Sequence, residues 1–224
     1  MQGRPGLRRR FDLIVFDWDG TLMDSAAAIV ASLQGACSDL GFPVPSDEAA
    51  RYVIGLGLHD AMAHILPGVE PARYPSIGER YRDHFLRHDP DTSLFGGAMD
   101  LIAELHEAGF LLAVATGKGR RGLERSLAAT GLKRYFHATR CADEGFSKPH
   151  PGMLEALLDE LGVAPDRALM IGDTVHDMKM AQAAGVSRVG IAHGAHARSA
   201  LLDYEPLACV EDLAGLGEWL RLHS

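Results

Sequence analysis

The sequence predicts an α/β protein, namely a doubly wound parallel sheet with an α-helical domain inserted after its first strand. Short, continuous apolar runs alternate with helical patterns over the second half of the chain, as strands buried on both faces of a parallel sheet do. By contrast, residues 24–90 have a helical pattern and no convincing strand. In addition, three apolar runs end directly in polar, reactive side chains, which is where ligands bind in open α/β sheets.

The first strand is the apolar run at residues 11–17, and the insert follows it. A polar, Ala-rich stretch at residues 24–40 predicts a helix that ends at Gly41. Ser46 precedes two acidic residues, a pattern typical of a helix N-terminus. The helical pattern then continues to about residue 88, interrupted by Gly55-Leu56-Gly57 and again by a Pro-Gly pair.

After residue 90 the expected elements alternate between strand and helix. Strands are expected at residues 110–115, 136–140, 168–171 and 187–192, the last of which is predicted to be the final strand. Helices are expected at residues 99–108, 120–129, 153–161 and 178–184, and each of the four is followed within two residues by a glycine. This alternation predicts a sheet with helices on both faces.

The expected domain organisation follows from these elements. Residues 11–23 and 91–224 form the α/β catalytic core, and residues 24–90 form the α-helical cap. Residues 1–10 contain four arginines and are expected to be a flexible, basic N-terminus.

Composition excludes several functional classes. The net charge of −8 argues against sequence-independent nucleic-acid binding, which needs a basic surface. No stretch approaches the roughly 20 apolar residues of a membrane-spanning helix, so no membrane partner is expected. The three cysteines are far apart in the sequence, which disfavours structural disulfides and fits a reducing, cytoplasmic location. The oligomeric state is left open.

The pair Asp17 and Asp19 is the most informative feature of the chain. Residues two apart on a strand share a face, so the two carboxylates repel each other. A cation or a shared proton would relieve that repulsion. The pair therefore suggests a metal site with a spare carboxylate for acid–base chemistry.

Other reactive groups are expected at the same edge of the sheet. Thr116 and Gly117 follow one apolar run, Asp173 follows another, and Lys148 lies in a loop between a strand and a helix. Carboxylates suit a hard cation such as Mg²⁺, whereas a hydroxyl, an ammonium group and backbone amides suit phosphate oxygens.

In this order, the motifs resemble those of the haloacid dehalogenase (HAD) superfamily. They are Asp17-Trp18-Asp19-Gly20-Thr21, Thr116-Gly117, Lys148-Pro149 and Gly172-Asp173-Thr174-x-x-Asp177. The match covers residues 11 to about 200, and the helical insert resembles the superfamily's α-helical cap of the first type. The phosphoglycolate phosphatase-like members are the most similar, and a Rossmann-like core is implied.

The resemblance implies a role for each motif residue. Asp17 would be the nucleophile that becomes an aspartyl phosphate, and Asp19 the general acid and base. Thr116 and Lys148 would hold the transferring phosphoryl group. Mg²⁺ would be bound by Asp17, by Asp173 and by the backbone carbonyl of Asp19. Supporting roles fall to Asp177, Gly117, Gly20 and Thr21.

Substrate contacts are predicted at Gly57, Leu58 and His59, which lie where similar phosphatases have a specificity loop, and at Lys118. Each has a structural alternative. The glycines can be a helix break that packing requires, and Lys118 can simply begin the next helix.

The predicted function is that of an enzyme, a Mg²⁺-dependent phosphatase (a phosphoric monoester hydrolase) acting on a small phosphorylated metabolite through an aspartyl phosphate. Asp19 favours phosphoryl chemistry, because dehalogenases of the superfamily lack this second aspartate. A β-phosphoglucomutase-like phosphomutase or a pyrophosphatase is the alternative within the superfamily. A phospho-aspartate signalling or binding module is the alternative of another class. The substrate itself is left open.

Overall fold

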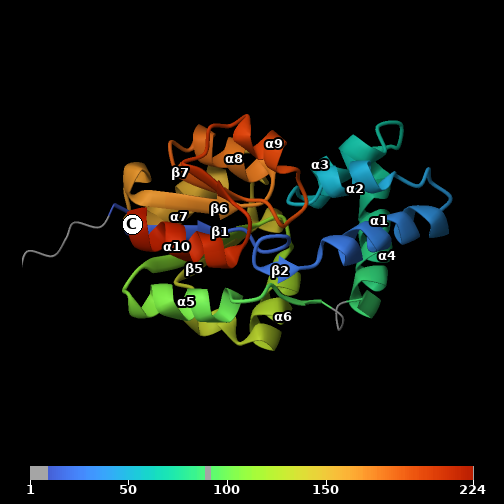
Figure 1. The fold of residues 1–224 in the computed structure, drawn as a ribbon. Helices are drawn as coiled ribbons and strands as arrows, with labels where there is room; N and C mark the ends of the chain where they lie inside the picture. Colours follow the sequence, from blue (N-terminus) through green and yellow to red (C-terminus); the bar gives the residue numbers. More distant parts are fainter. Residues whose placement is uncertain (1–9, 89–91, 224) are drawn as a thin grey trace, which may run out of the picture.

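Six parallel strands form the central sheet of the computed structural model, which describes residues 10–88 and 92–223 (Figure 1). The strands are β1 (Leu13–Phe16), β4 (Leu111–Thr116), β5 (Ala138–Cys141), β6 (Ala168–Gly172), β7 (Ser187–Ile191) and β8 (Ala208–Val210). Their order across the sheet is β5-β4-β1-β6-β7-β8, so the direction of winding reverses at β1. Ligand sites of open α/β sheets lie at such a reversal, beyond the carboxyl ends of the strands.

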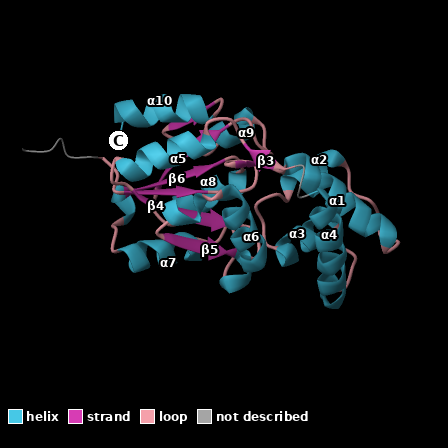
Figure 2. Cartoon of the chain, turned by 90° about the horizontal axis from the view of Figure 1, so that it is seen from below, coloured by secondary structure: helices cyan, strands magenta, loops and turns pink. Residues whose placement is uncertain are grey.

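Helices cover both faces of this sheet, as Figure 2 shows. Ile14 and Phe16 of β1 belong to the apolar cluster formed with α5 (Ala98–Glu107), α6 (Arg120–Thr130) and α10 (Leu213–His223). Leu13 and Val15 belong to the cluster formed with α7 (Gly152–Leu161) and α8 (Val175–Ala183). Neighbouring residues of a strand point to opposite faces of the sheet, so a continuous apolar run contributes to both clusters. The prediction of a parallel sheet covered by helices on both faces is confirmed.

A second group of helices lies beside the sheet and is called the helical lobe here (Figure 1). It contains α1 (Ala26–Asp39), α2 (Asp47–Tyr52), α3 (Leu58–Ile65) and α4 (Tyr74–His88), which share an apolar cluster of their own. Two short antiparallel strands, β2 (Met23–Asp24) and β3 (Ser93–Leu94), lie where the chain enters and leaves the lobe. The break predicted at the Gly55-Leu56-Gly57 segment separates α2 from α3.

Three expectations differ from the structure. The strand at residues 187–192 is not the final one, because the three-residue β8 follows α9 (Arg198–Leu202) and pairs with β7. Helix α8 begins at Val175, three residues earlier than predicted, because Thr174 caps it and its first turn is buried although polar. The pair β2–β3 was not predicted, since two-residue strands carry no detectable alternation. Short 3₁₀ turns also lie in the described part of the chain, at η1 (Pro71–Arg73), η3 (Leu132–Tyr135), η4 (Ala142–Glu144) and η5 (Pro165–Arg167).

Parts of the expected domain organisation lie outside the described residues. They include residues 1–9 of the basic N-terminus and the boundary at residues 90 and 91. Among the helices described, none combines the length and the apolar character needed to cross a membrane. The cytoplasmic location stays a prediction.

Candidate active site

The carboxyl ends of three neighbouring strands bring the predicted residues together. Asp17 follows β1, Thr116 is the last residue of β4, and Asp173 follows β6. All three side chains are buried, with at most 1% of each residue exposed. The adjacency of these strands in the sheet therefore produces the cluster that the sequence predicted at this edge.

Lys148 lies between two of the aspartates. Its Nζ is 2.8 Å from Oδ1 of Asp17 and 2.7 Å from Oδ1 of Asp177, and the lysine is fully buried. Burial by itself lowers the pKa of a lysine, but the two flanking carboxylates outweigh it and raise the pKa of Lys148. Lys148 is therefore a cation inside the site, and Asp177, for which the resemblance implies a supporting role, contacts it directly.

Asp17 has one oxygen engaged and one free. Its Oδ1 accepts the backbone N–H of Trp18 at 2.6 Å and contacts Lys148, whereas its Oδ2 is buried without a hydrogen-bond partner. Burial raises the pKa of Asp17 well above its usual range, although Lys148 opposes this. A buried, unpaired carboxylate oxygen is costly, so Oδ2 is a position where a cation or a reacting atom belongs.

Asp173 is held on both of its oxygens. The hydroxyl of Thr21 donates to Oδ1 at 2.7 Å, and the backbone N–H of Ala195 donates to Oδ2 at 2.7 Å. Burial, followed by the nearby charge of Asp177, raises the pKa of Asp173 to about 7. Gly20 is required beside it, because its φ is +82° and a Cβ there would lie 2.3 Å from Oδ2 of Asp173.

Three carboxylates form a group that fits a metal ion. Oxygens of Asp17, Asp173 and Asp177 lie within 4.8 Å of one another, and all three residues are buried. A carboxylate donor set suits Mg²⁺, and the unpartnered Oδ2 of Asp17 supports the fit. The side chain of Asp19 is not part of this group, and metal binding through its backbone carbonyl stays a prediction.

The side chain of Asp19 instead contacts Lys118 and Ser25. Oδ2 is 3.0 Å from Nζ of Lys118, and the hydroxyl of Ser25 donates to Oδ1 at 2.7 Å. Nζ of Lys118 also lies 4.6 Å from the ring centroid of Phe85 on α4. Lys118, predicted to contact substrate, is thus a partner of the proposed acid–base residue and connects it to the helical lobe. No sequence pattern pointed to Ser25 as a partner of Asp19.

The loop between α2 and α3 covers the site. A Cβ on Gly117 would lie 2.4 Å from the carbonyl oxygen of Gly55, so only glycine permits this approach. The hydroxyl of Ser147, next to Lys148, donates to Asp60 of the lobe at 2.5 Å. Between the lobe and the core is a cavity of about 1070 Å³. Its lining includes the predicted residues Asp17, Asp19, Gly57, Leu58, His59, Thr116, Gly117 and Lys118.

Two histidines of the core bind the lobe, and sequence reasoning missed both. Nε2 of His176 and Nε2 of His196 lie 2.7 Å and 3.1 Å from the carbonyl oxygen of Tyr52. The N–H of Val175 donates to Nδ1 of His196, so Nε2 of His196 carries its proton and donates it. Burial lowers the pKa of His176 to about 4 and lowers that of His196, so both are neutral donors at pH 7. No sequence pattern connects residue 52 with these two positions.

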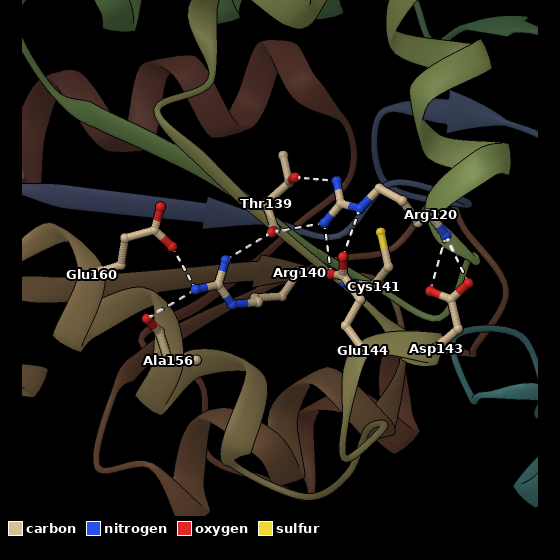
Figure 3. A network of polar contacts seen from close by, with 8 residues as sticks. All are labelled: Arg120, Thr139, Arg140, Cys141, Asp143, Glu144, Ala156 and Glu160. Atoms are coloured by element: carbon tan, nitrogen blue, oxygen red, sulfur yellow. Dashed lines mark hydrogen bonds and ion pairs between the residues drawn. The ribbon is translucent and has the colours of Figure 1, made fainter.

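A polar network joins the start of α6 to β5 and to the residues that follow β5 (Figure 3). Arg120, at the start of α6, binds Glu144 through Nε at 2.8 Å and Nη2 at 2.6 Å, and it also donates to Thr139 of β5. Asp143 accepts the backbone N–H of Arg120, and Glu144 accepts that of Cys141. The segment before Lys148 is therefore tied to the helix that follows Thr116. Burial raises the pKa of the Cys141 thiol to about 12, so this cysteine is structural.

Comparisons with known proteins show the family of this chain. The model of the family described as "Haloacid dehalogenase-like hydrolase" matches residues 14–191. The chain is 36% identical over 205 residues to "Probable phosphatase IndB" of Dickeya dadantii, covering 89% of each chain. It is 32% identical to "Tyrosine-protein kinase PtkA" of Mycobacterium tuberculosis, covering 92% of this chain and 70% of that one. It is 30% identical to a "Phosphoglycolate phosphatase" of Agrobacterium fabrum, covering 91% of this chain and 90% of that one.

The fold is also that of a solved structure described as a hydrolase from Pseudomonas syringae. The TM-score is 0.88 at 23% sequence identity, and the match covers 94% of this chain and 98% of that one. The likeness extends over both the sheet and the helical lobe, because the matched share includes nearly all of the chain.

Proposed function

The chain belongs to the haloacid dehalogenase-like hydrolases, and from this premise we propose that it is a Mg²⁺-dependent phosphatase that acts on a small phosphomonoester through an aspartyl phosphate at Asp17. The membership confirms the family resemblance stated from the four motifs. The observation that carries the proposal is the free, buried Oδ2 of Asp17 beside a buried lysine and two further carboxylates.

The proposed first step is attack by Oδ2 of Asp17 on phosphorus. A bond forms between Oδ2 and phosphorus, the ester P–O bond breaks, and Asp19 donates a proton to the leaving oxygen. In the second step Asp19 takes a proton from water, the water oxygen binds phosphorus, and the bond to Asp17 breaks. Inorganic phosphate leaves, and both aspartates return to their starting forms.

Lys148 and Thr116 supply charge and hydrogen bonds to the phosphoryl oxygens in this proposal. The ammonium group of Lys148 forms ion pairs with Asp17 and Asp177, and its Nζ has no hydrogen-bond partner among the described residues. Its N–H donors are therefore proposed to bind phosphoryl oxygens, as is the hydroxyl of Thr116, which lines the cavity over Asp17. Lys148 thereby offsets the negative charge that two buried aspartates and a phosphate bring together.

Mg²⁺ would be held by Asp17, Asp173 and the backbone carbonyl of Asp19, while Asp177, the third carboxylate of the cluster, pairs with Lys148. When bound, it supplies charge neutralisation between a carboxylate nucleophile and an anionic phosphate. Residues 24–90 are proposed to act as the cap. Its contacts to the core through Tyr52 and Asp60 support this proposal, because they hold the lobe against the part of the core that carries the site.

Phosphate release from a panel of esters, measured with Mg²⁺ and with chelator, tests the proposal. Asp17→Asn is expected to lose activity by at least ~10³-fold, since removal of a nucleophile leaves only residual catalysis. Asp159→Asn, which changes an exposed aspartate on α7, is the matched control and is expected to keep full activity. Full activity of Asp17→Asn, or activity without a divalent cation, would refute the proposal.

The same assay separates the alternatives. A phosphomutase would convert a sugar phosphate into its isomer without net phosphate release, and a pyrophosphatase would prefer pyrophosphate. The likeness to a protein named as a tyrosine kinase adds phosphoryl transfer to tyrosine as an outcome to be measured, with a tyrosine peptide as acceptor. A signalling module would instead retain a long-lived phosphoryl group on Asp17.

A further inference from the structure

The cavity over Asp17 is larger than a two-carbon phosphate requires. Its volume is about 1070 Å³, and a liquid water occupies about 30 Å³. The cavity therefore has room for a ligand of drug-like size, for which pockets of roughly 300–1,000 Å³ are usual. Asp17 and Asp19 line its reactive part, and α4 and α6 line the remainder from the lobe and from the core.

The lobe side of this remainder is apolar and aromatic. Tyr81 and Phe85 of α4 lie with ring centroids 5.9 Å apart, and Leu86, the next residue of this helix, also lines the cavity. Leu86 is 48% exposed, and Phe146 on the core side is 68% exposed. The described part of the chain has eight exposed large apolar residues, and three of them, Leu58, Leu86 and Phe146, line this cavity. Such grouping indicates an apolar ligand.

The same region also carries unpaired positive charge. Arg82 on α4 and Arg121 on α6 line the cavity, and neither forms an ion pair with any residue that the structure describes. Two acids that also line the cavity have other partners: Asp60 accepts the hydroxyl of Ser147, and Asp143 accepts the backbone N–H of Arg120. Two arginines without partners beside an apolar wall suit an anionic group on the far end of a ligand.

We propose, on the basis of the proposed phosphatase function, that the substrate is a phosphomonoester with a ring-bearing, apolar body and a second anionic group. The phosphate reaches Asp17, the ring lies against Tyr81, Phe85 and Leu86, and the second anion meets Arg82 and Arg121. This class differs from phosphoglycolate, which has a second anion but no apolar body to bury.

Three esters test the two halves of this inference: phosphoglycolate, phenyl phosphate and 4-carboxyphenyl phosphate. The ring is expected to raise kcat/KM by at least ~10-fold over phosphoglycolate, through burial of its apolar surface. The carboxylate is expected to add a further ~2- to 5-fold, the usual effect of an exposed arginine pair. A higher kcat/KM for phosphoglycolate would overturn the first half, and equal values for the two ring esters would overturn the second.

Two variants assign the effect to the cavity wall. Leu86→Ser is expected to raise KM for phenyl phosphate by ~3-fold or more. The control is Leu202→Ser, because Leu202 is also 48% exposed but lies on α9 and does not line the cavity. Arg121→Gln is expected to abolish the preference for 4-carboxyphenyl phosphate over phenyl phosphate. Retention of that preference would refute the role of Arg121.

Failure of this inference is distinguishable from failure of the proposed function. Asp17→Asn binds an ester without turning it over, so calorimetry on this variant compares affinities for the three esters directly. A preference for the ring esters in binding, without phosphate release by the unmodified enzyme, would support the substrate class and refute the phosphatase. Phosphate release by the unmodified enzyme, together with tightest binding of phosphoglycolate, would support the phosphatase and refute the proposed substrate class.

Discussion

Removal of one buried carboxylate is expected to stabilise the metal-free protein. Asp173 lies among Asp17 and Asp177, and burial together with the charge of Asp177 raises its pKa to about 7. In Asp173→Asn the amide carbonyl can accept the N–H of Ala195, and the NH₂ group can donate to Oγ1 of Thr21. The variant therefore keeps both contacts and loses the buried charge.

The magnitude follows from the shift in pKa. A rise from 3.8 to about 7 is roughly three units, and each unit corresponds to about 1.4 kcal/mol, so the ionised carboxylate costs about 4 kcal/mol above pH 7. Weaker hydrogen bonding by the amide offsets part of this, which leaves an expected gain of about 2–4 kcal/mol in the free energy of unfolding. For a chain of this length that is a rise in Tm of about 5–15 °C.

The sign of the pH dependence is fixed by the same shift. The unfolded chain releases the proton of residue 173 near pH 4, whereas the folded protein retains it to about pH 7. The contribution of Asp173 to stability is therefore fully present below pH 4 and is lost as the pH rises to 7. The difference between Asp173→Asn and the unmodified protein should be small at pH 4 and largest at pH 8.

Urea unfolding in chelator at pH 5 and at pH 8 measures this difference, with Asp159→Asn as the exposed control. Addition of Mg²⁺ should then stabilise the unmodified protein and leave Asp173→Asn nearly unchanged, because the ion binds the folded state through this carboxylate. The reasoning fails if Asp173→Asn is less stable than the unmodified protein at pH 8, or if Mg²⁺ stabilises both equally.

Three further expectations concern single residues of the site. Lys148→Met should lower the free energy of unfolding by about 3–5 kcal/mol in urea titrations and abolish phosphate release, because it leaves two buried aspartates without their cation. Gly20→Ala should lose Mg²⁺-induced stabilisation in thermal unfolding, since its Cβ would lie 2.3 Å from Asp173, while Gly68→Ala, whose Cβ meets nothing within 4 Å, should not. Burial lowers the pKa of His176 to about 4, so the stability contributed by its neutral form is full above pH 6.5. This contribution to the free energy of unfolding falls by about 3 kcal/mol as the pH drops to 4. The variant His176→Gln should remove this pH dependence, as measured by unfolding at several pH values.

The sheet and the lobe were predictable because their patterns are long. Apolar runs such as residues 110–115 extend through both faces of a parallel sheet, so every residue in them is apolar and the signal is continuous. The three-residue β8 gave no such signal, because its outer residues are only half-buried. The start of α8 was not predictable from a hydrophobic pattern, because its first turn buries two polar residues, His176 and Asp177. Their burial depends on polar contacts, such as that of His176 with Tyr52, which such a pattern does not contain.

The sequence by itself determined which chemical groups end each strand, since an apolar run followed by Asp17, Thr116 or Asp173 needs only local alternation and a turn. Only the tertiary structure decided their partners. Lys118 contacts Asp19, Asp177 contacts Lys148, and two histidines hold Tyr52, in each case across strands or across the lobe boundary. Pairing depends on strand order and on helix packing, which bring residues far apart in the sequence into contact, such as Tyr52 and His176, and leave no trace in local spacing.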